Sequence, residues 1–149
     1  FLYGVGGDDG SAVQPHPVAN LRARIVELRT LEDGDTVSYG ATYRAHGQRR
    51  IATLAVGYAD GYRRSSSNRG EVLVHGRRVP VAGMVTMDMT MVDVSTVSCH
   101  VGDVATLIGG DSDELIDVNT VARLAELSPY EILVGLRLRV PRRYTGGEG

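Results

Sequence analysis

The sequence predicts a mainly β protein: an antiparallel β-barrel or Greek-key-like domain with one or two short helices. Many short runs rich in β-branched residues follow one another at intervals of roughly ten residues, with glycine-containing turns between them. Only one stretch carries sustained helical spacing. A series of short strands with so little helix is typical of an antiparallel barrel or sandwich.

The first third of the chain is expected to hold strands joined by tight turns. Apolar and charged residues largely alternate over residues 21–29, the pattern of a strand with one buried face. A polar turn around Gly34 precedes two short extended segments at 36–38 and 42–45. A buried strand is expected at 50–56, where the residues are mostly apolar.

The middle of the chain predicts a hairpin and three further β segments. The hairpin pairs 71–74 with 78–81 around a turn at His75 and Gly76. The further segments are expected at 84–86, 90–94 and 104–108, and the glycine-rich run 109–113 is expected to be a loop.

One helix is expected near the end of the chain. Asp117 is a candidate N-cap, and apolar residues follow at i, i+3, i+4 and i+7 from Val118. Pro129 is expected to end this helix, and 130–133 to add one more helical turn. A last strand is expected at 136–140.

Length and composition narrow the possible functions. A chain of 149 residues makes one domain, or one domain with a stub of another. A net charge of −2 gives no field suited to nucleic acid or anionic lipid. Cys99 is the only cysteine, which excludes a disulfide framework and favours a reducing compartment. The four histidines are scattered beside turns, so no metal site is expected.

The first residues predict a domain boundary. An apolar, strand-like start is followed by a run of glycine, aspartate and serine, which is typical of a linker between domains. The boundary is expected near residues 5–17, and the chain is expected to be the C-terminal piece of something longer.

Tyrosines are the candidate functional groups. Tyr39 and Tyr58 each lie beside a glycine, which permits a tight turn or a close approach. A tyrosine has an ordinary pKa of about 10, so a catalytic one needs a cation or a donor nearby. The alternative is that both are half-buried tyrosines at hairpin edges. Asp60 and Asp88 could pair as carboxylates, although their spacing does not require it.

Seven motifs in order resemble the C-terminal domain of the alanine racemase family, which is dependent on pyridoxal 5′-phosphate (PLP). They span nearly the whole chain and comprise Val37–Tyr43, Val56–Tyr62, Ser67-Asn68, Val79–Gly83, Met87-Asp88, Ser128–Glu131 and Arg139–Arg142.

The resemblance implies a two-domain cytoplasmic enzyme that supplies D-alanine for peptidoglycan. Residues 1–17 would be the end of an N-terminal (β/α)8 barrel plus a linker, and 18–149 the C-terminal β domain. The family forms head-to-tail homodimers, in which each site combines one subunit's barrel with the other's β domain. PLP is held by a barrel lysine. This chain contains no lysine, so it is expected to be inactive alone.

The resemblance also assigns roles to individual residues. Tyr39 matches the catalytic base that faces the lysine across the dimer interface and serves one face of the substrate's Cα. Met87 matches the residue whose backbone N–H meets the substrate carboxylate, and Tyr58 lines the same pocket. Tyr130 matches the tyrosine that hydrogen-bonds the PLP phosphate in its own subunit.

The entryway to the site is where the chain departs from the family. Asp88 and Arg64 match positions in the entry corridor. Thr86 stands where many members carry cysteine, and Met84 where many carry arginine. The charge of the corridor and the access of substrate to the site are therefore expected to differ from those in many members of the family.

Two alternatives remain open at the level of sequence. One keeps the fold but changes the substrate, for example to serine or a broader range of amino acids. The other is a non-catalytic β-barrel module used for binding or assembly, in which the tyrosines are structural.

Overall fold

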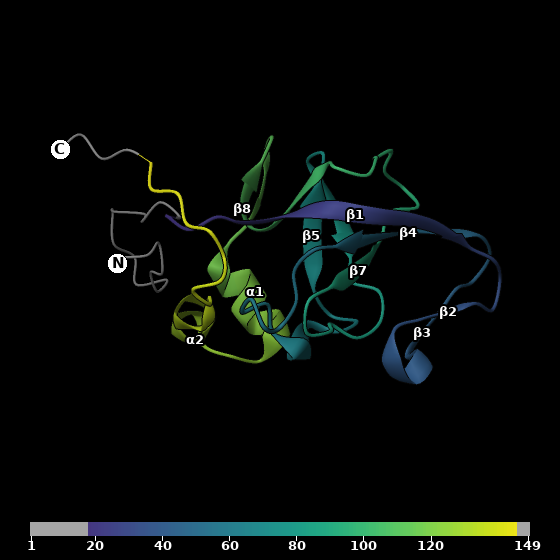
Figure 1. Cartoon of the computed structure of the whole chain (residues 1–149), viewed down its shortest axis with the longest axis horizontal. Coiled ribbons are helices and arrows are strands. Elements are labelled where there is room, and N and C mark those ends of the chain that lie inside the picture. The colour runs from purple at the N-terminus through teal and green to yellow at the C-terminus, as the bar shows by residue number, and fades with distance from the viewer. Residues whose placement is uncertain (1–17, 146–149) are drawn as a thin grey trace, which may run out of the picture.

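A seven-stranded antiparallel sheet forms the body of the protein in the computed structural model, which describes residues 18–145 (Figure 1). The boundary expected near residues 5–17 lies outside the described residues. The strand order is β6-β5-β8-β1-β4-β7, and β9 pairs with β8. The strands are β1 (Leu21–Leu31), β4 (Arg49–Leu54), β5 (Glu71–Val74), β6 (Arg77–Pro80), β7 (Thr90–Asp93), β8 (Val104–Asp111) and β9 (Glu114–Ile116).

The long strand β1 connects the two halves of the sheet. Its first half pairs with β8 and its second half with β4, with an irregularity in register between Ile25 and Glu27. Such a bulge bends a strand and increases its twist. Buried and exposed residues alternate from Leu21 to Ile25, which confirms the strand predicted from alternation.

The sheet curls without closing into a continuous barrel. Its outer strands β6 and β7 come together at one isolated bridge, Val81 to Val92, and the Ala82 N–H donates to the Met91 carbonyl at 2.8 Å. The predicted antiparallel β architecture is confirmed, whereas a complete ladder between the two outer strands does not form.

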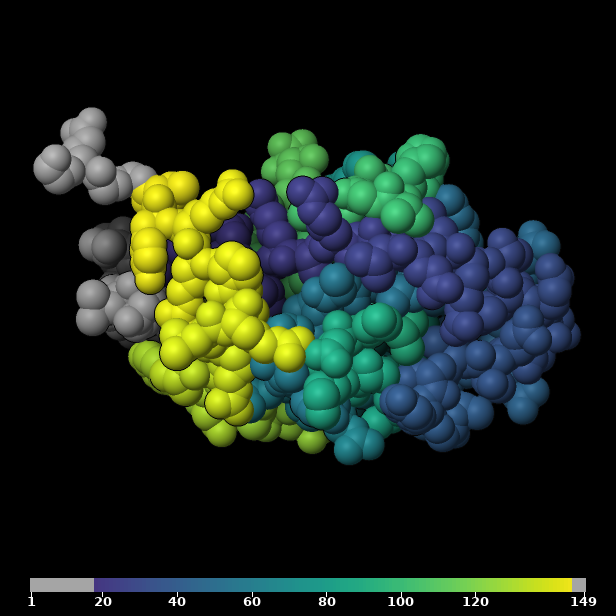
Figure 2. Space-filling view, in the orientation of Figure 1, coloured from purple at the N-terminus to yellow at the C-terminus, as the bar shows by residue number. Residues whose placement is uncertain are grey.

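A small hairpin lies at the opposite end of the sheet from the helices (Figure 1). It consists of β2 (Thr36–Val37) and β3 (Tyr43–Arg44), joined through the 3₁₀ turn η1 (Tyr39–Ala41). Val37 is fully buried in a small apolar cluster with Leu31 and Ile51, separate from the main core. The space-filling view shows the hairpin as one end of the molecule (Figure 2).

Two short helices follow β9. In α1 (Val118–Ala125) the Asp117 carboxylate accepts from the Thr120 N–H at 2.6 Å, which confirms the predicted N-cap. Glu126 in the left-handed conformation ends this helix. Pro129 begins α2 (Pro129–Gly135) and does not end α1, since proline fits the first turn of a helix.

Besides the role of Pro129, three further local predictions were wrong. The 84–86 segment is not a strand. The expected loop 109–113 is instead the end of β8 and its turn into β9. The strand expected at 136–140 is absent, because amides there bond within turns and to the Asp60 carbonyl, which accepts from the Arg137 N–H at 3.0 Å.

Candidate functional site

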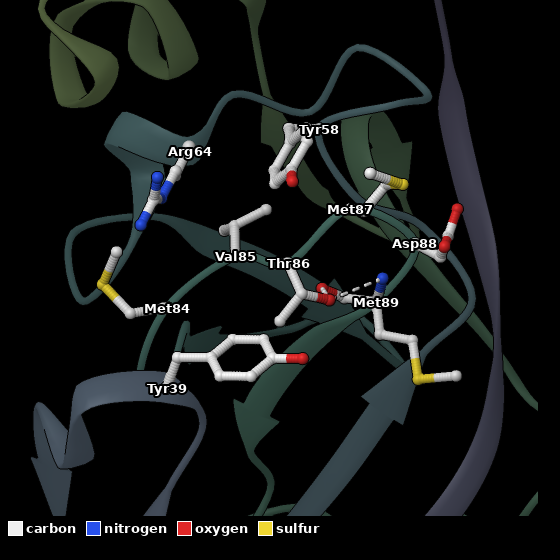
Figure 3. A pocket seen from close by; sticks show the side chains of 9 residues that line it. All are labelled: Tyr39, Tyr58, Arg64, Met84, Val85, Thr86, Met87, Asp88 and Met89. Atoms are coloured by element: carbon white, nitrogen blue, oxygen red, sulfur yellow. Dashed lines mark hydrogen bonds between the residues drawn. The ribbon is translucent and has the colours of Figure 1, made fainter.

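An open pocket of about 580 Å³ lies between the hairpin and two loops of the sheet (Figure 3). It contains five of the six predicted site residues, namely Tyr39, Tyr58, Arg64, Met87 and Asp88. The other lining residues are Met84, Val85, Thr86 and Met89. The pocket therefore brings together side chains that are up to fifty residues apart, as the motif resemblance implied.

Tyr39 enters the pocket from a turn with unusual backbone geometry. Ser38 has φ 65° and ψ −179°, a region populated almost only by glycine, and Ala41 has φ 49°. Each such residue costs about 1–3 kcal/mol and persists only where the surroundings hold it. The Tyr39 side chain is 76% exposed, so the turn presents the phenol outward.

Tyr58 lies on a loop that is bonded directly to the opposite pocket wall. The Tyr58 N–H donates to the Thr86 carbonyl and the Ala59 N–H to the Met87 carbonyl, each at 2.9 Å. A Cβ on Gly57 would collide with the backbone of these same two residues. Gly57 therefore provides room for another stretch of backbone.

The segment 84–89 turns sharply around Thr86. The Thr86 N–H donates to the Met89 carbonyl at 2.9 Å, and the Thr86 hydroxyl lies 3.2 Å from the Met89 nitrogen (Figure 3). The turn leaves Met87 53% exposed. Among residues 18–145 the Met87 N–H has no hydrogen-bond acceptor, so this donor remains available to a small molecule.

Arg139 joins two carboxylates at the edge of the pocket. Its Nε lies 2.5 Å from Asp60 Oδ1, and its terminal nitrogen Nη2 lies 2.5 Å from Asp88 Oδ1. The hydrogen bonds to Asp60 and then to Asp88 raise the pKa of the Arg139 guanidinium. Asp60 and Asp88 are thus joined through a cation, an arrangement that sequence spacing alone did not reveal.

Tyr43 connects the hairpin to strand β7. Its hydroxyl donates to Asp93 Oδ2 at 2.8 Å. Burial, together with this bond to a carboxylate, raises the pKa of Tyr43 to about 12. Burial opposes ionisation of Asp93, yet the bonds from Ser95 and Tyr43 lower the pKa of Asp93 overall. Tyr43 is therefore a neutral structural donor.

Tyr130 lies outside this pocket, on the first turn of α2. Its side chain is 57% exposed. The helix start is fixed by a capping box, in which Glu131 N–H donates to the Ser128 hydroxyl and Ser128 N–H to the Glu131 carboxylate. Hydrogen bonding of the Glu131 carboxylate to Ser128, chiefly to its backbone N–H, lowers the pKa of Glu131. The phenol is therefore displayed from a rigid helix end.

Arg64 reaches the pocket from the short 3₁₀ turn η2 (Arg64–Ser66). It provides the pocket with a positive charge, and Asp88 provides a negative one.

Within residues 18–145 no three metal-ligating side chains come together. No helix in this part of the chain is long and apolar enough to cross a membrane.

The fold and the pocket define a mainly β domain that displays phenols, a guanidinium and a free backbone donor on an open surface. Such groups suit a small carboxylic acid, because the donors complement a carboxylate and a phenol exchanges protons.

Residues 18–144 match the family model "Alanine racemase, C-terminal domain". The chain belongs to the alanine racemase family and corresponds to its C-terminal domain. It is 47% identical over 133 residues to the alanine racemase of Symbiobacterium thermophilum, covering 89% of this chain and 35% of that protein. The chain spans between 33% and 39% of the length of such curated relatives.

Solved structures agree with this assignment. The biosynthetic alanine racemase of Pseudomonas aeruginosa superposes with a TM-score of 0.87 at 40% identity, covering 97% of this chain and 40% of that one. The Bartonella henselae alanine racemase, described with covalently bound pyridoxal phosphate, gives 0.88 at 30% identity, covering 96% and 39%.

Proposed function

We propose that this chain is the C-terminal β domain of an alanine racemase that interconverts L- and D-alanine. In this proposal a preceding barrel domain binds PLP, and Tyr39 reaches the barrel of the other subunit in a head-to-tail homodimer. The enzyme would work in the cytoplasm and supply D-alanine for peptidoglycan. The family match and the solved relatives support the reaction; the dimer and the location rest on the resemblance.

This domain can contact PLP through residues on its surface but cannot attach it covalently. No lysine exists in the 149-residue sequence, so covalent attachment must come from elsewhere. The exposed Tyr130 phenol, held at the capped start of α2, has the donor that a phosphate requires. When bound, PLP withdraws electrons from the substrate Cα–H bond and makes that proton removable.

Tyr39 is proposed to carry the proton on one face of the substrate. Inversion at Cα requires a proton to leave one face and another to arrive on the opposite face. The phenol is exposed and lines the same pocket as Arg64, so its hydroxyl is open to a small molecule bound there. On the other face the proton carrier would be the barrel lysine.

The Met87 N–H is the observation that most directly supports a carboxylate substrate. It is a backbone donor on the pocket wall without an acceptor among the described residues. A hydrogen bond to such a donor contributes about 0.5–1.5 kcal/mol. Tyr58 would close the pocket beside the substrate and limit the size of its side chain.

The test is turnover by the full-length protein that contains this chain, with PLP, on L-alanine, D-alanine, L-serine and larger amino acids. Alanine racemisation with serine at least about tenfold slower is expected, since one added hydroxyl changes binding by about 1–3 kcal/mol. Faster serine turnover would favour the broader racemase. No turnover of any amino acid, with PLP bound, would favour a non-catalytic module.

A further inference from the structure

Asn68 connects three separate segments behind Tyr39. Its Nδ2 donates to the Thr42 Oγ1 at 3.0 Å, and its Oδ1 accepts from the Gly83 N–H at 2.7 Å. The Asn68 backbone N–H also donates to the Gly83 carbonyl at 3.2 Å. With φ 54°, Asn68 adopts the left-handed conformation that asparagine tolerates better than most residues.

The hairpin also touches the pocket wall directly at Gly83. A Cβ on Gly83 would lie 2.9 Å from the Val37 carbonyl oxygen and 3.0 Å from the Ser38 Cβ. The Ser38 hydroxyl donates to the Met84 carbonyl at 2.9 Å. The turn 38–42 is therefore fastened on both sides of Tyr39: by Ser38 before it and, through Asn68, by Thr42 after it.

Tyr39 itself has no comparable attachment. No hydrogen bond to its hydroxyl occurs among residues 18–145, and its ring is mostly exposed. The position of the phenol is consequently set by the backbone of the turn. That backbone contains Ser38 and Ala41 at positive φ, a geometry that relaxes unless neighbouring contacts hold it.

We propose that Asn68 is a positioning residue for Tyr39: through Thr42 and Gly83 it holds the strained turn 38–42 at a fixed place beside the pocket wall 83–89. The effect on catalysis, the catalytic part of the proposal, rests on the proposed function. The mechanical part, that Asn68 holds the turn 38–42 in place, concerns this chain alone. Asn68 touches neither substrate nor cofactor in this account. It acts on the reaction only through the location of the Tyr39 hydroxyl.

The mechanical part is tested by hydrogen–deuterium exchange of the 149-residue chain. Asn68→Gly removes the side chain while keeping the left-handed backbone accessible, and Thr42→Val removes the acceptor. Both are expected to speed exchange within 39–42, read at the Ala41 amide, which donates to the Ser38 carbonyl at 3.4 Å, by up to about tenfold, the cost of one lost hydrogen bond. Thr42→Ser, which keeps Oγ, should restore slow exchange.

The matched controls are Thr36→Val, the same chemical change on the same hairpin, and Asn119→Gly on α1. Within residues 18–145 neither of these side chains forms a hydrogen bond. Both should leave exchange at 39–42 as in the parent chain. Equal exchange at 39–42 in Asn68→Gly, Thr42→Val and the parent would overturn the proposal, whatever the enzymatic results.

The catalytic part uses the full-length protein with PLP. A misplaced phenol should lower kcat by about tenfold or more in Asn68→Gly, while KM for alanine changes less than twofold. The α-deuterium isotope effect should rise for one enantiomer only, the one whose proton Tyr39 carries. Isotope effects that rise equally for both enantiomers, or a kcat equal to that of the parent despite loosened 38–42 amides, would refute the positioning role. A parent protein without racemase activity would instead refute the proposed function.

Discussion

The Arg139 guanidinium lies 2.5 Å from Asp60 Oδ1, which joins the segment after α2 to the loop that carries Tyr58. Asp60 is buried, and its other oxygen accepts from the Gly57 N–H at 2.8 Å. The same carboxylate thus organises its own loop and anchors the C-terminal segment to it. The second bond of Arg139, to Asp88, extends this connection to the pocket wall.

Arg139→Gln should loosen both the Tyr58 loop and the pocket wall. It leaves the buried Asp60 carboxylate without its cation, and losing one partner of such a pair is destabilising. We expect a lower urea midpoint and faster amide exchange at 57–60 and 86–89. Arg143→Gln is the control, since its side chain is exposed and has no hydrogen bond among the described residues. Equal midpoints in the two variants would show that the Arg139 pair is not structural.

Gly57→Ala should be strongly destabilising. The added methyl group would collide with backbone atoms of Thr86 and Met87, which cannot rotate away as a side chain can. We expect a loss of about 3 kcal/mol or more in unfolding free energy. Gly110→Ala is the matched control, because its Cβ would meet only the Glu114 carbonyl oxygen, at 3.7 Å. A Gly57→Ala variant as stable as the control would contradict the close backbone approach.

Tyr43→Phe should reduce stability at neutral pH. It removes the 2.8 Å hydrogen bond to Asp93, whose charged carboxylate makes such a bond worth about 1.5–3 kcal/mol. Urea unfolding at pH 7 measures the difference between the parent and the variant.

The pH dependence of that difference has a defined sign. The pKa of Tyr43 is about 12 in the folded chain and about 10 when unfolded. A raised pKa gives stability that is complete below pH 10 and is lost as the pH rises towards 12. The parent should therefore lose its advantage over Tyr43→Phe between about pH 10 and pH 12. An advantage that stays constant up to pH 12 would contradict this assignment.

Ser128→Ala should fray the start of α2, on which Tyr130 is displayed. The substitution removes one half of the capping box and is expected to cost about 1 kcal/mol. Amide exchange at 130–132 should accelerate. Ser98→Ala, at an exposed serine without a side-chain hydrogen bond within residues 18–145, should leave stability and exchange unchanged. Unchanged exchange in Ser128→Ala would mean that the cap does not hold this helix end.

The elements with local sequence signals were predictable. Alternation identified β1, and the Asp117 cap before an apolar run identified α1. A helical turn was expected at 130–133, but the capping box at Ser128 and the role of Pro129 in starting α2 were missed. The 109–113 segment was misassigned because its glycines suggest a loop. In the structure Gly109 is at φ 106° and lies against the Asn20 side chain, so the glycine allows a close contact within a strand.

The pocket was predictable as a set of residues but not as an arrangement. The motif resemblance selected Tyr39, Tyr58 and Met87, and the structure places these residues on one pocket. Asn68 and Arg139 were part of the motifs, yet their partners are separated from them by 26 and 79 residues in the chain. No periodicity or spacing rule relates residues so far apart, so these contacts required the folded structure.

We propose that Tyr39 carries a proton on one face of the substrate. The two enantiomers have equal free energy in solution, so kcat/KM must be the same in both directions for any variant. The asymmetry must therefore be sought in exchange of the α-proton with solvent, measured separately from each enantiomer.

The decisive measurement is turnover and solvent deuterium uptake by the full-length protein carrying Tyr39→Phe, with Tyr144→Phe as the control at an exposed tyrosine. We expect racemisation to fall by about 10²-fold or more in Tyr39→Phe. We also expect α-proton exchange to persist for one enantiomer and to be lost for the other. Racemisation and exchange of both enantiomers at the parent's rates would contradict the proposal.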